Sequence, residues 1–149
     1  MIIRFEVPMI PAAKGRPRFA RVGKFVRTFT PEKTETAERN LIALAAPHAP
    51  AEPMRGPITF IAEFKFPIPK GWPRWKREVA RSRGIGLGSY HHVSRPDLDN
   101  LLKLVLDALT STGRWWLDDS QIVSVWATKR YSESPGTRVE IAELDQAVR

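Results

Sequence analysis

Five aspartates lie close together in a chain whose formal net charge at pH 7 is +8: Asp97, Asp99, Asp107, Asp118 and Asp119. Carboxylates that come near one another raise each other's pKa and repel, so they remain ionised together only when a cation neutralises them. Carboxylate oxygens, without cysteine or clustered histidine, suit Mg²⁺ or Mn²⁺. The residues therefore predict a divalent-metal site, provided that the fold brings their side chains together.

An amphipathic helix over residues 98–112 is predicted to carry the first part of this set. Its apolar residues recur with helical spacing and form one stripe, made of Leu98, Leu101, Leu102, Val105, Leu106 and Leu109. Asp97 stands at the expected N-cap, and Gly113 stands where the helix should end. Asp99 and Lys103 lie one turn apart on the polar flank of this helix.

The second part of the set, Asp118 and Asp119, occupies a turn that precedes a β-branched segment at residues 122–131. This segment predicts a strand. A helix and an adjacent strand of one α+β unit can bring the Asp97/Asp99 end near the Asp118/Asp119 turn. We therefore expect three or four carboxylates to converge.

Each of these residues has a simpler interpretation when it is taken alone. Asp97 is then a helix cap, and Asp99 and Lys103 form an exposed ion pair one turn apart. Two aspartates in a turn are then ordinary solvated turn residues. Their combination in a basic protein favours the metal site.

The central stretch resembles the RusA family of Holliday junction resolvases. The resemblance rests on Pro96-Asp97-Leu98-Asp99-Asn100-Leu101, on Lys103, on Asp107-Ala108-Leu109 and on Trp116-Leu117-Asp118-Asp119-Ser120-Gln121-Ile122. It implies a small, dimeric, Mg²⁺-dependent endodeoxyribonuclease. Carried over position by position, it implies that Asp97, Asp99 and Asp119 are metal-binding catalytic carboxylates, that Lys103 is a catalytic lysine, and that Asp118 is a further candidate ligand.

Positive charge is concentrated in two segments on either side of the acidic stretch. Residues 14–27 hold six basic residues and no acid, residues 65–83 carry a net charge of +6, and the rest of the chain sums to −4. Such segments predict contacts to DNA phosphates, which position a duplex without reading its sequence. The residues expected to make them are Lys14, Arg16, Arg18, Arg21, Lys70, Arg74, Lys76 and Arg77.

Composition excludes several other classes of function. The chain has 149 residues, enough for one domain with its own core, and no cysteine, which excludes thiolate zinc sites and thiol catalysis. It shows no signal peptide and no apolar run of membrane-spanning length, so we expect a cytoplasmic protein. The glycines of residues 84–88 lack the spacing of a nucleotide-binding loop, and adjacent His91 and His92 point apart in an extended segment.

The expected fold is a single α+β domain over residues 1–149. A mixed or antiparallel sheet is predicted to pack against two main helices, at residues 31–46 and 98–112, with strands at residues 2–7, 58–66, 122–131 and 137–143. The last two strands are predicted to pair as a hairpin around the turn at residues 132–136. Outside the sheet we expect a basic loop, a short strand and a basic helix, at residues 12–19, 24–29 and 73–83, the last ended by Gly84.

Together these features predict a homodimeric, Mg²⁺-dependent endodeoxyribonuclease that resolves four-way DNA junctions by paired hydrolysis in recombination and repair. A two-fold dimer presents two equivalent sites, and a four-way junction requires paired cuts. Two alternatives remain open at this point. One is a nuclease for flaps, forks or RNA, and the other is a non-catalytic DNA-binding or regulatory protein whose acidic cluster is a relic or a structural ion site.

Overall fold

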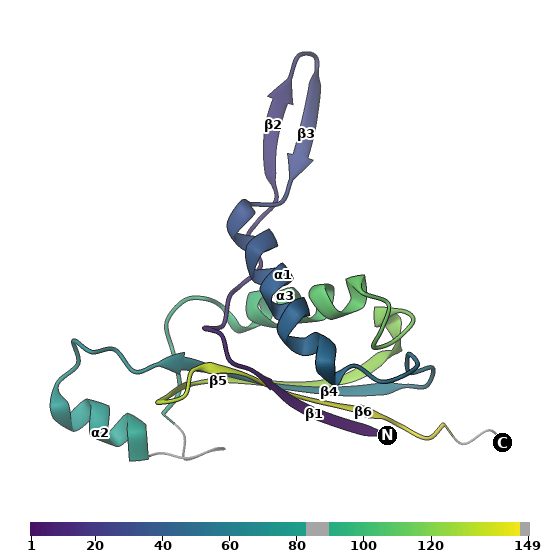
Figure 1. Cartoon of the computed structure of the whole chain (residues 1–149). Helices are drawn as coiled ribbons and strands as arrows, with labels where there is room; N and C mark the ends of the chain where they lie inside the picture. The colour runs from purple at the N-terminus through teal and green to yellow at the C-terminus, as the bar shows by residue number, and fades with distance from the viewer. Residues whose placement is uncertain (83–89, 147–149) are drawn as a thin grey trace.

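The computed structural model, which describes residues 1–82 and 90–146, is built around one long strand, β4 (Ile58–Pro67). β4 pairs in parallel with β5 (Ile122–Ser132) on one side and antiparallel with β6 (Gly136–Glu143) on the other. β6 also pairs with β1 (Ile2–Val7), which gives the strand order β1-β6-β4-β5. The predicted α+β class and the mixed sheet are confirmed (Figure 1).

The predicted hairpin between the last two strands is wrong. β4 lies between β5 and β6, so these two strands do not pair with each other. β6 suits an inner position in the sheet, because its Val139 and Ile141 side chains are almost completely buried. Much of β5 is exposed, which suits an edge strand. Turn residues at positions 132–136 indicate that the chain reverses there, but they do not determine which strand becomes its neighbour.

Two helices, α1 (Glu32–Ala45) and α3 (Leu98–Ser111), cover one face of this sheet (Figure 1). The short basic helix predicted at residues 73–83 is confirmed as α2 (Arg74–Ser82). The predicted end of α2 at residues 83–84 lies outside the described residues. No helix in the part of the chain that the structure describes is long and apolar enough to cross a membrane.

The buried face of α3 is rotated slightly from the predicted stripe. Leu104 and Ala108, which the prediction left out, are buried, whereas Leu98, Leu102 and Leu106 are only half-buried. The rotation follows because α3 packs against both the sheet and α1. The helix ends as predicted at Gly113, whose φ of +62° suits glycine.

Two adjacent tryptophans that follow α3, Trp115 and Trp116, are buried in the core. Trp115 stacks on Phe5 with ring centroids 5.0 Å apart, and Trp116 meets Phe60 edge-on. The Trp116 Nε1–H donates a hydrogen bond to Thr110 Oγ1 at 2.9 Å, so its polar atom is satisfied although the ring is buried. These contacts hold the segment after α3 rigidly against the sheet.

A two-stranded hairpin projects from the body of the molecule (Figure 1). It consists of β2 (Arg18–Val22) and β3 (Phe25–Phe29), which pair only with each other. The predicted strand at residues 24–29 is confirmed, but β2 was missed because its beginning was assigned to the basic loop at residues 12–19. We refer to residues 18–29 as the basic hairpin.

Gly136 lies close to the backbone of β1, because a Cβ at this position would lie 2.8 Å from the carbonyl oxygen of Val7. We expect Gly136→Ala to lower the free energy of unfolding by about 1–3 kcal/mol through this overlap. Gly71→Ala is the matched control, since a Cβ there has nothing within 4 Å. Urea denaturation of both variants checks the prediction, and equal effects would contradict it.

Candidate active site and nucleic-acid surface

Asp97 and Asp99 lie at the amino-terminal end of α3 with exposed side chains. Asp97 occupies the N-cap position, as predicted, and its backbone oxygen accepts from the N–H of Leu101 at 3.1 Å. Its carboxylate makes no capping hydrogen bond. The capping interpretation therefore accounts for the position of Asp97 but not for its charged group, which remains available to a ligand.

Lys103 lies one turn further along α3 and is exposed. Among the ion pairs of the described residues none joins Asp99 to Lys103, so the simple interpretation of these two as an exposed pair does not hold. Two carboxylates and an ammonium group thus face solvent from two successive turns of one helix. This combination can bind a cation and a phosphate at the same place.

The start of α3 is fixed by contacts from other elements. Lys129 of β5 donates from Nζ to the carbonyl oxygens of Ser94 and Pro96, at 2.7 and 2.8 Å. The N–H of Lys14 donates to the carbonyl of Asn100 at 3.0 Å. Asp97 and Asp99 are therefore held on a rigid support, which a catalytic constellation requires.

Asp118 and Asp119 belong to a tight turn in front of β5, with Asp119 beginning a short 3₁₀ helix, η2 (Asp119–Gln121). The carboxylate of Asp118 caps this helix by accepting from the N–H of Ser120 at 2.9 Å. Hydrogen bonds from the Ser120 side chain and backbone lower the pKa of Asp118 below its ordinary value. Asp118 thus has a structural function in the turn, which leaves Asp119 as the stronger candidate ligand there.

Gln121 fastens this turn to the segment before β4. Its side-chain oxygen accepts from the N–H groups of Leu117 and Asp118, and its Nε2 donates to the carbonyls of Met54 and Gly56, all at 2.8–3.0 Å. The position of Asp119 is therefore tied to the end of the sheet where β4 and β5 begin.

The predicted convergence of these carboxylates within one chain is wrong. α3 has 14 residues, so its two ends are about 20 Å apart at 1.5 Å per residue. Asp97 and Asp99 lie at its first end, near Lys129, whereas Asp119 follows its second end and precedes the first residue of β5. In residues 1–82 and 90–146, no three His, Cys, Asp or Glu side chains are grouped so that they could hold a metal ion.

The parallel pairing of β4 with β5 is the physical reason. The chain leaves β4 at one end of the sheet and must return to the other end before β5 can run in the same direction. α3 makes this return. The Asp118/Asp119 turn follows α3, so it lies at the end of the sheet opposite to the first residue of α3.

Lys14 joins three elements and does not point freely into solvent. Its Nζ forms ion pairs with Asp107 of α3 and, at 3.4 Å, with Glu38 of α1. Partial burial alone would lower the pKa of Lys14, but Asp107 and Glu38 outweigh it, so the pKa lies above its ordinary value of 10.5. The contacts give Lys14 and Asp107 a structural role in holding the basic loop against both helices.

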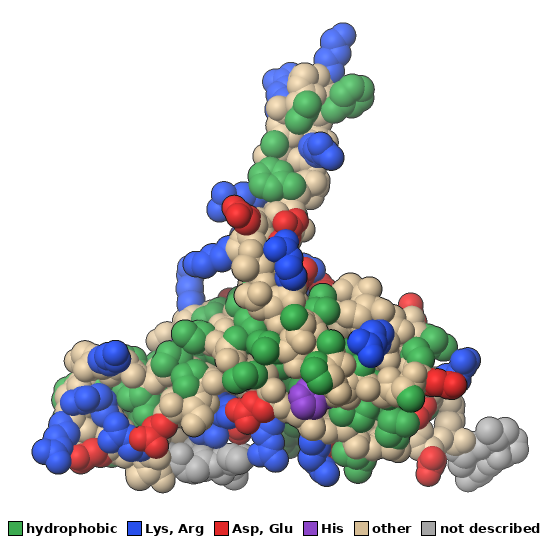
Figure 2. All heavy atoms as spheres, in the orientation of Figure 1, with side chains coloured by type: hydrophobic (Ala, Val, Ile, Leu, Met, Phe, Trp, Pro, Cys, Tyr) green, Lys and Arg blue, Asp and Glu red, His purple; other side chains and the backbone are tan. Residues whose placement is uncertain are grey.

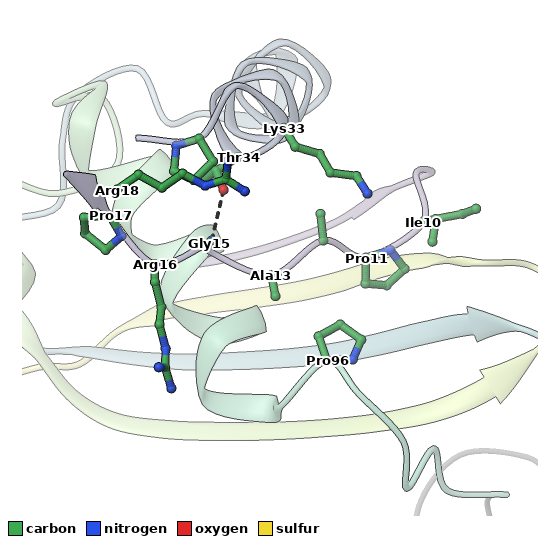
Figure 3. A pocket seen from close by; sticks show the side chains of 12 residues that line it. Ile10, Pro11, Ala13, Gly15, Arg16, Pro17, Arg18, Lys33, Thr34 and Pro96 are labelled. Carbon is green, nitrogen blue, oxygen red and sulfur yellow. Dashed lines mark hydrogen bonds between the residues drawn. The ribbon is translucent and has the colours of Figure 1, made fainter. Parts of the chain in front are cut away.

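A pocket of about 720 Å³ opens beside the start of α3 (Figure 3). Arg16, Arg18 and Lys33 provide its positive charge, and Pro96, the residue before Asp97, forms part of its wall. The N–H of Gly15 donates to Thr34 Oγ1 at 2.9 Å and fixes the loop on α1. Lys33 was not predicted, because it lies in a helix and carries no motif; only its place in the fold brings it to the pocket.

The second basic segment surrounds α2, and Figure 2 shows its Lys and Arg side chains far from those of the basic hairpin. Lys76 lies 3.9 Å from the ring centroid of Trp72, and Arg74 pairs with Glu78 at 2.9 Å. Trp72 packs against Tyr131, whereas Trp75 is exposed. Lys70 is exposed and Arg77 is half-buried, so this surface retains positive charge for an anionic partner.

The adjacent histidines, His91 and His92, lie beside β5. His92 is buried and stacks on Phe66, with centroids 4.0 Å apart. Burial, helped by the nearby positive charge of Lys129, lowers the pKa of His92. The backbone of His91 forms an isolated antiparallel bridge with Arg130 at the edge of β5.

A mixed-sheet domain that carries free carboxylates next to a basic pocket and a basic hairpin has the features of an enzyme that processes nucleic acid. Residues 8–142 match the family model described as Endodeoxyribonuclease RusA. This chain therefore belongs to the RusA endodeoxyribonuclease family, as the motif predicted, and is a nuclease.

Two curated relatives match this chain, and one of them carries the RusA name. The chain is 33% identical to the protein named "Uncharacterized protein YqaN" of Bacillus subtilis (strain 168) over 143 residues, which cover 95% of this chain and 96% of that protein. It is 35% identical to the crossover junction endodeoxyribonuclease rusA of Lactococcus phage r1t over 92 residues, which cover 62% of this chain and 56% of the phage protein.

The ion pair between Lys14 and Asp107 allows a test of whether Lys14 stabilises the fold or contacts DNA. A double-mutant cycle with Lys14→Met and Asp107→Asn should give a coupling energy of about 0.5–1 kcal/mol in urea denaturation, a modest value because the Asp107 side chain is 37% exposed. Since the pKa of Lys14 is raised, this contribution is complete below 10.5 and is lost as the pH rises through the folded value. Unchanged stability together with weaker DNA binding would instead establish Lys14 as a phosphate contact.

Proposed function

We propose that this protein is a homodimeric, Mg²⁺-dependent endodeoxyribonuclease that resolves four-way DNA junctions by paired phosphodiester hydrolysis. The observation that carries the proposal is the group of free Asp97, Asp99 and Lys103 side chains beside a basic pocket, in a chain of the RusA family. The phage relative is named a crossover junction endodeoxyribonuclease, which supports branched DNA as the substrate. The enzyme would act in recombination and repair, in the cytoplasm where that DNA lies.

The residues at the start of α3 fit a hard divalent cation, but one chain supplies only part of the ligand set. The two exposed carboxylates of Asp97 and Asp99 offer oxygen donors of the kind that Mg²⁺ prefers, and Mn²⁺ could replace it. A third carboxylate, Asp119, lies about 20 Å away at the other end of α3. A second copy of the chain can supply it, with Asp118 beside it as the weaker candidate.

β5 has the properties of the surface where that second copy would bind. It is an edge strand of the sheet, and in the described part of the chain its outer side pairs only through one isolated bridge, between His91 and Arg130. Trp126 is 71% exposed, and Val123 and Val125 are exposed as well. Native proteins rarely leave an apolar edge strand of this length uncovered.

Two-fold symmetry across β5 would complete the site. Two copies of β5 that pair edge to edge about a two-fold axis perpendicular to the strands run antiparallel, so the beginning of one strand lies at the end of the other. The Asp119 turn of one chain would then face the Asp97/Asp99 end of its partner. The same symmetry would generate two such sites, which matches the paired cuts that a four-way junction requires.

The chain's own residues would then divide the work of hydrolysis. When bound, the cation offsets charge on the scissile phosphate and lowers the pKa of a water molecule. Asp97, Asp99 and the partner's Asp119 would hold the ion. Lys103 would stabilise negative charge that develops on the phosphate or the leaving oxygen. Arg16, Arg18 and Lys33 would hold a neighbouring phosphate in the pocket and orient the strand.

Cleavage of a labelled four-way junction, mapped on a denaturing gel, tests the activity. We expect symmetric paired nicks with Mg²⁺ or Mn²⁺ and none after chelation. Asp97→Asn and Asp119→Asn should each reduce cleavage by at least about 100-fold while junction binding persists. Asp145→Asn, at an exposed aspartate in the carboxy-terminal segment, serves as the control and should cleave normally.

The same assay separates the alternative functions. If the protein cleaves flaps, forks or RNA in preference to the four-way junction, it is a nuclease of another specificity. DNA processing that is unaffected by Asp97→Asn, with binding intact, would show that this cluster is not catalytic.

Mixing two inactive variants tests the shared site. In a mixed dimer of Asp97→Asn and Asp119→Asn chains, one site that draws on both chains regains all its carboxylates, while the other loses both. Random 1:1 mixing should therefore restore about a quarter of the wild-type active sites, and each active dimer should make a single nick. If both carboxylates of a site came from the same chain, mixing would restore nothing.

A further inference from the structure

The basic hairpin exposes large apolar side chains that the rest of the chain does not cover. Phe25 is 79% exposed and Phe19 is 73% exposed, and Val22 and Val26 are exposed as well. The hairpin stands away from the sheet and the helices, and its strands pair only with each other (Figures 1 and 2). A single two-stranded hairpin is at best marginally stable in water, and a cluster of exposed apolar residues generally marks a binding surface.

The register of the hairpin places these apolar side chains next to positive charge. Val22 lies opposite Phe25, and the two form an apolar tip. Gly23, with φ +61°, begins the turn between them, and Lys24 completes it. Below the tip, cationic and apolar residues lie opposite one another, in the pairs Arg18–Phe29 and Arg21–Val26.

Charge identifies the kind of molecule that covers this surface. Residues 18–27 contain Arg18, Arg21, Lys24 and Arg27 and no acid. None of these four side chains takes part in an ion pair in the described part of the chain. A second copy would bring the same charges against them, whereas a polyphosphate backbone would neutralise them.

The position of the hairpin indicates that the polyanion bound there is the DNA substrate. Arg18 is both the first residue of β2 and part of the pocket beside Pro96, so the root of the hairpin adjoins the Asp97 end of α3. Five residues of strand extend about 17 Å, which exceeds the depth of a DNA groove, about 8.5 Å. DNA held at the pocket therefore passes within reach of the tip.

Phosphate contacts explain the arginines but not the apolar tip. Phe and aliphatic side chains on DNA-bending proteins insert between base steps and unstack them, and aromatic rings stack on unpaired bases. At a branch point the strands change partners, so base stacking there is interrupted and insertion costs least.

We propose that the basic hairpin is a branch-point wedge, in which Phe25 and Val22 insert among the bases while Arg21 and Arg27 hold the flanking phosphates. The proposal rests on the junction-cleaving function proposed above and adds the element that senses the branch. It makes preference for branched over linear DNA a property of the hairpin tip, separate from the carboxylates that support hydrolysis.

Fluorescence of 2-aminopurine placed at the branch point tests the wedge. The full-length Asp97→Asn protein should raise this fluorescence on binding a four-way junction, because an unstacked base is less quenched. Adding Phe25→Ala should remove most of the rise and weaken junction binding by about tenfold, the loss of one stacked base, with little effect on linear duplex. Leu144→Ala is the control, since it removes an exposed apolar side chain outside the basic hairpin, and the fluorescence should rise normally.

Salt dependence separates the two kinds of contact. Phe25→Ala should leave the slope of log K against log salt unchanged, whereas Arg27→Ala should reduce it by about one. Urea denaturation should show that Phe25→Ala does not destabilise the body, because the side chain is outside the core.

The wedge and the nuclease can fail separately. If the wild-type protein nicks junctions but Phe25→Ala opens and binds them normally, the wedge is wrong and the nuclease stands. If Phe25→Ala converts dimers to monomers in sedimentation experiments, the tip is a protein–protein contact and the wedge is again wrong. Loss of nicking in Asp97→Asn with normal branch opening supports both proposals.

Discussion

The parallel pairing of β4 with β5 determines where every candidate functional group lies. A parallel pair cannot be joined by a tight turn, so the chain must cross the sheet, and α3 makes that crossing. The crossing puts Asp97 and Asp99 at one end of the domain and Asp119 at the other. It also leaves β5 at the edge of the sheet, where Trp126 is exposed.

The separation of the carboxylates gives the proposed dimer a chemical purpose. Close carboxylates repel in the absence of a cation, and a fold that keeps them apart in one chain avoids that cost. Assembly through an edge strand would bring them together only in the two-fold arrangement that also provides paired sites. The carboxylates of Asp97 and Asp99 are free to bind a cation, whereas the carboxylate of Asp118 caps η2 and stabilises the turn.

Positive charge serves two purposes in this molecule. Two lysines stabilise the elements around the site. Lys14 forms ion pairs with Asp107 and Glu38, and Lys129 donates to backbone carbonyls just before α3. The arginines of the basic hairpin and Lys70 near α2 are exposed and suit DNA phosphates. Composition alone cannot distinguish these uses, because a paired lysine and a free one look the same in the sequence.

Local sequence patterns were enough to predict most of the elements and the family. Alternating apolar residues specified β4, the apolar stripe and Gly113 specified α3, and the motif from Asp97 to Ile122 identified the family that the comparisons confirmed. The position of β6 between β1 and β4, and of the two acidic groups at opposite ends of α3, became apparent only from the fold. Local patterns record which face of an element is buried, whereas strand order and the distance between motifs depend on long-range pairing, which leaves no signal in neighbouring residues.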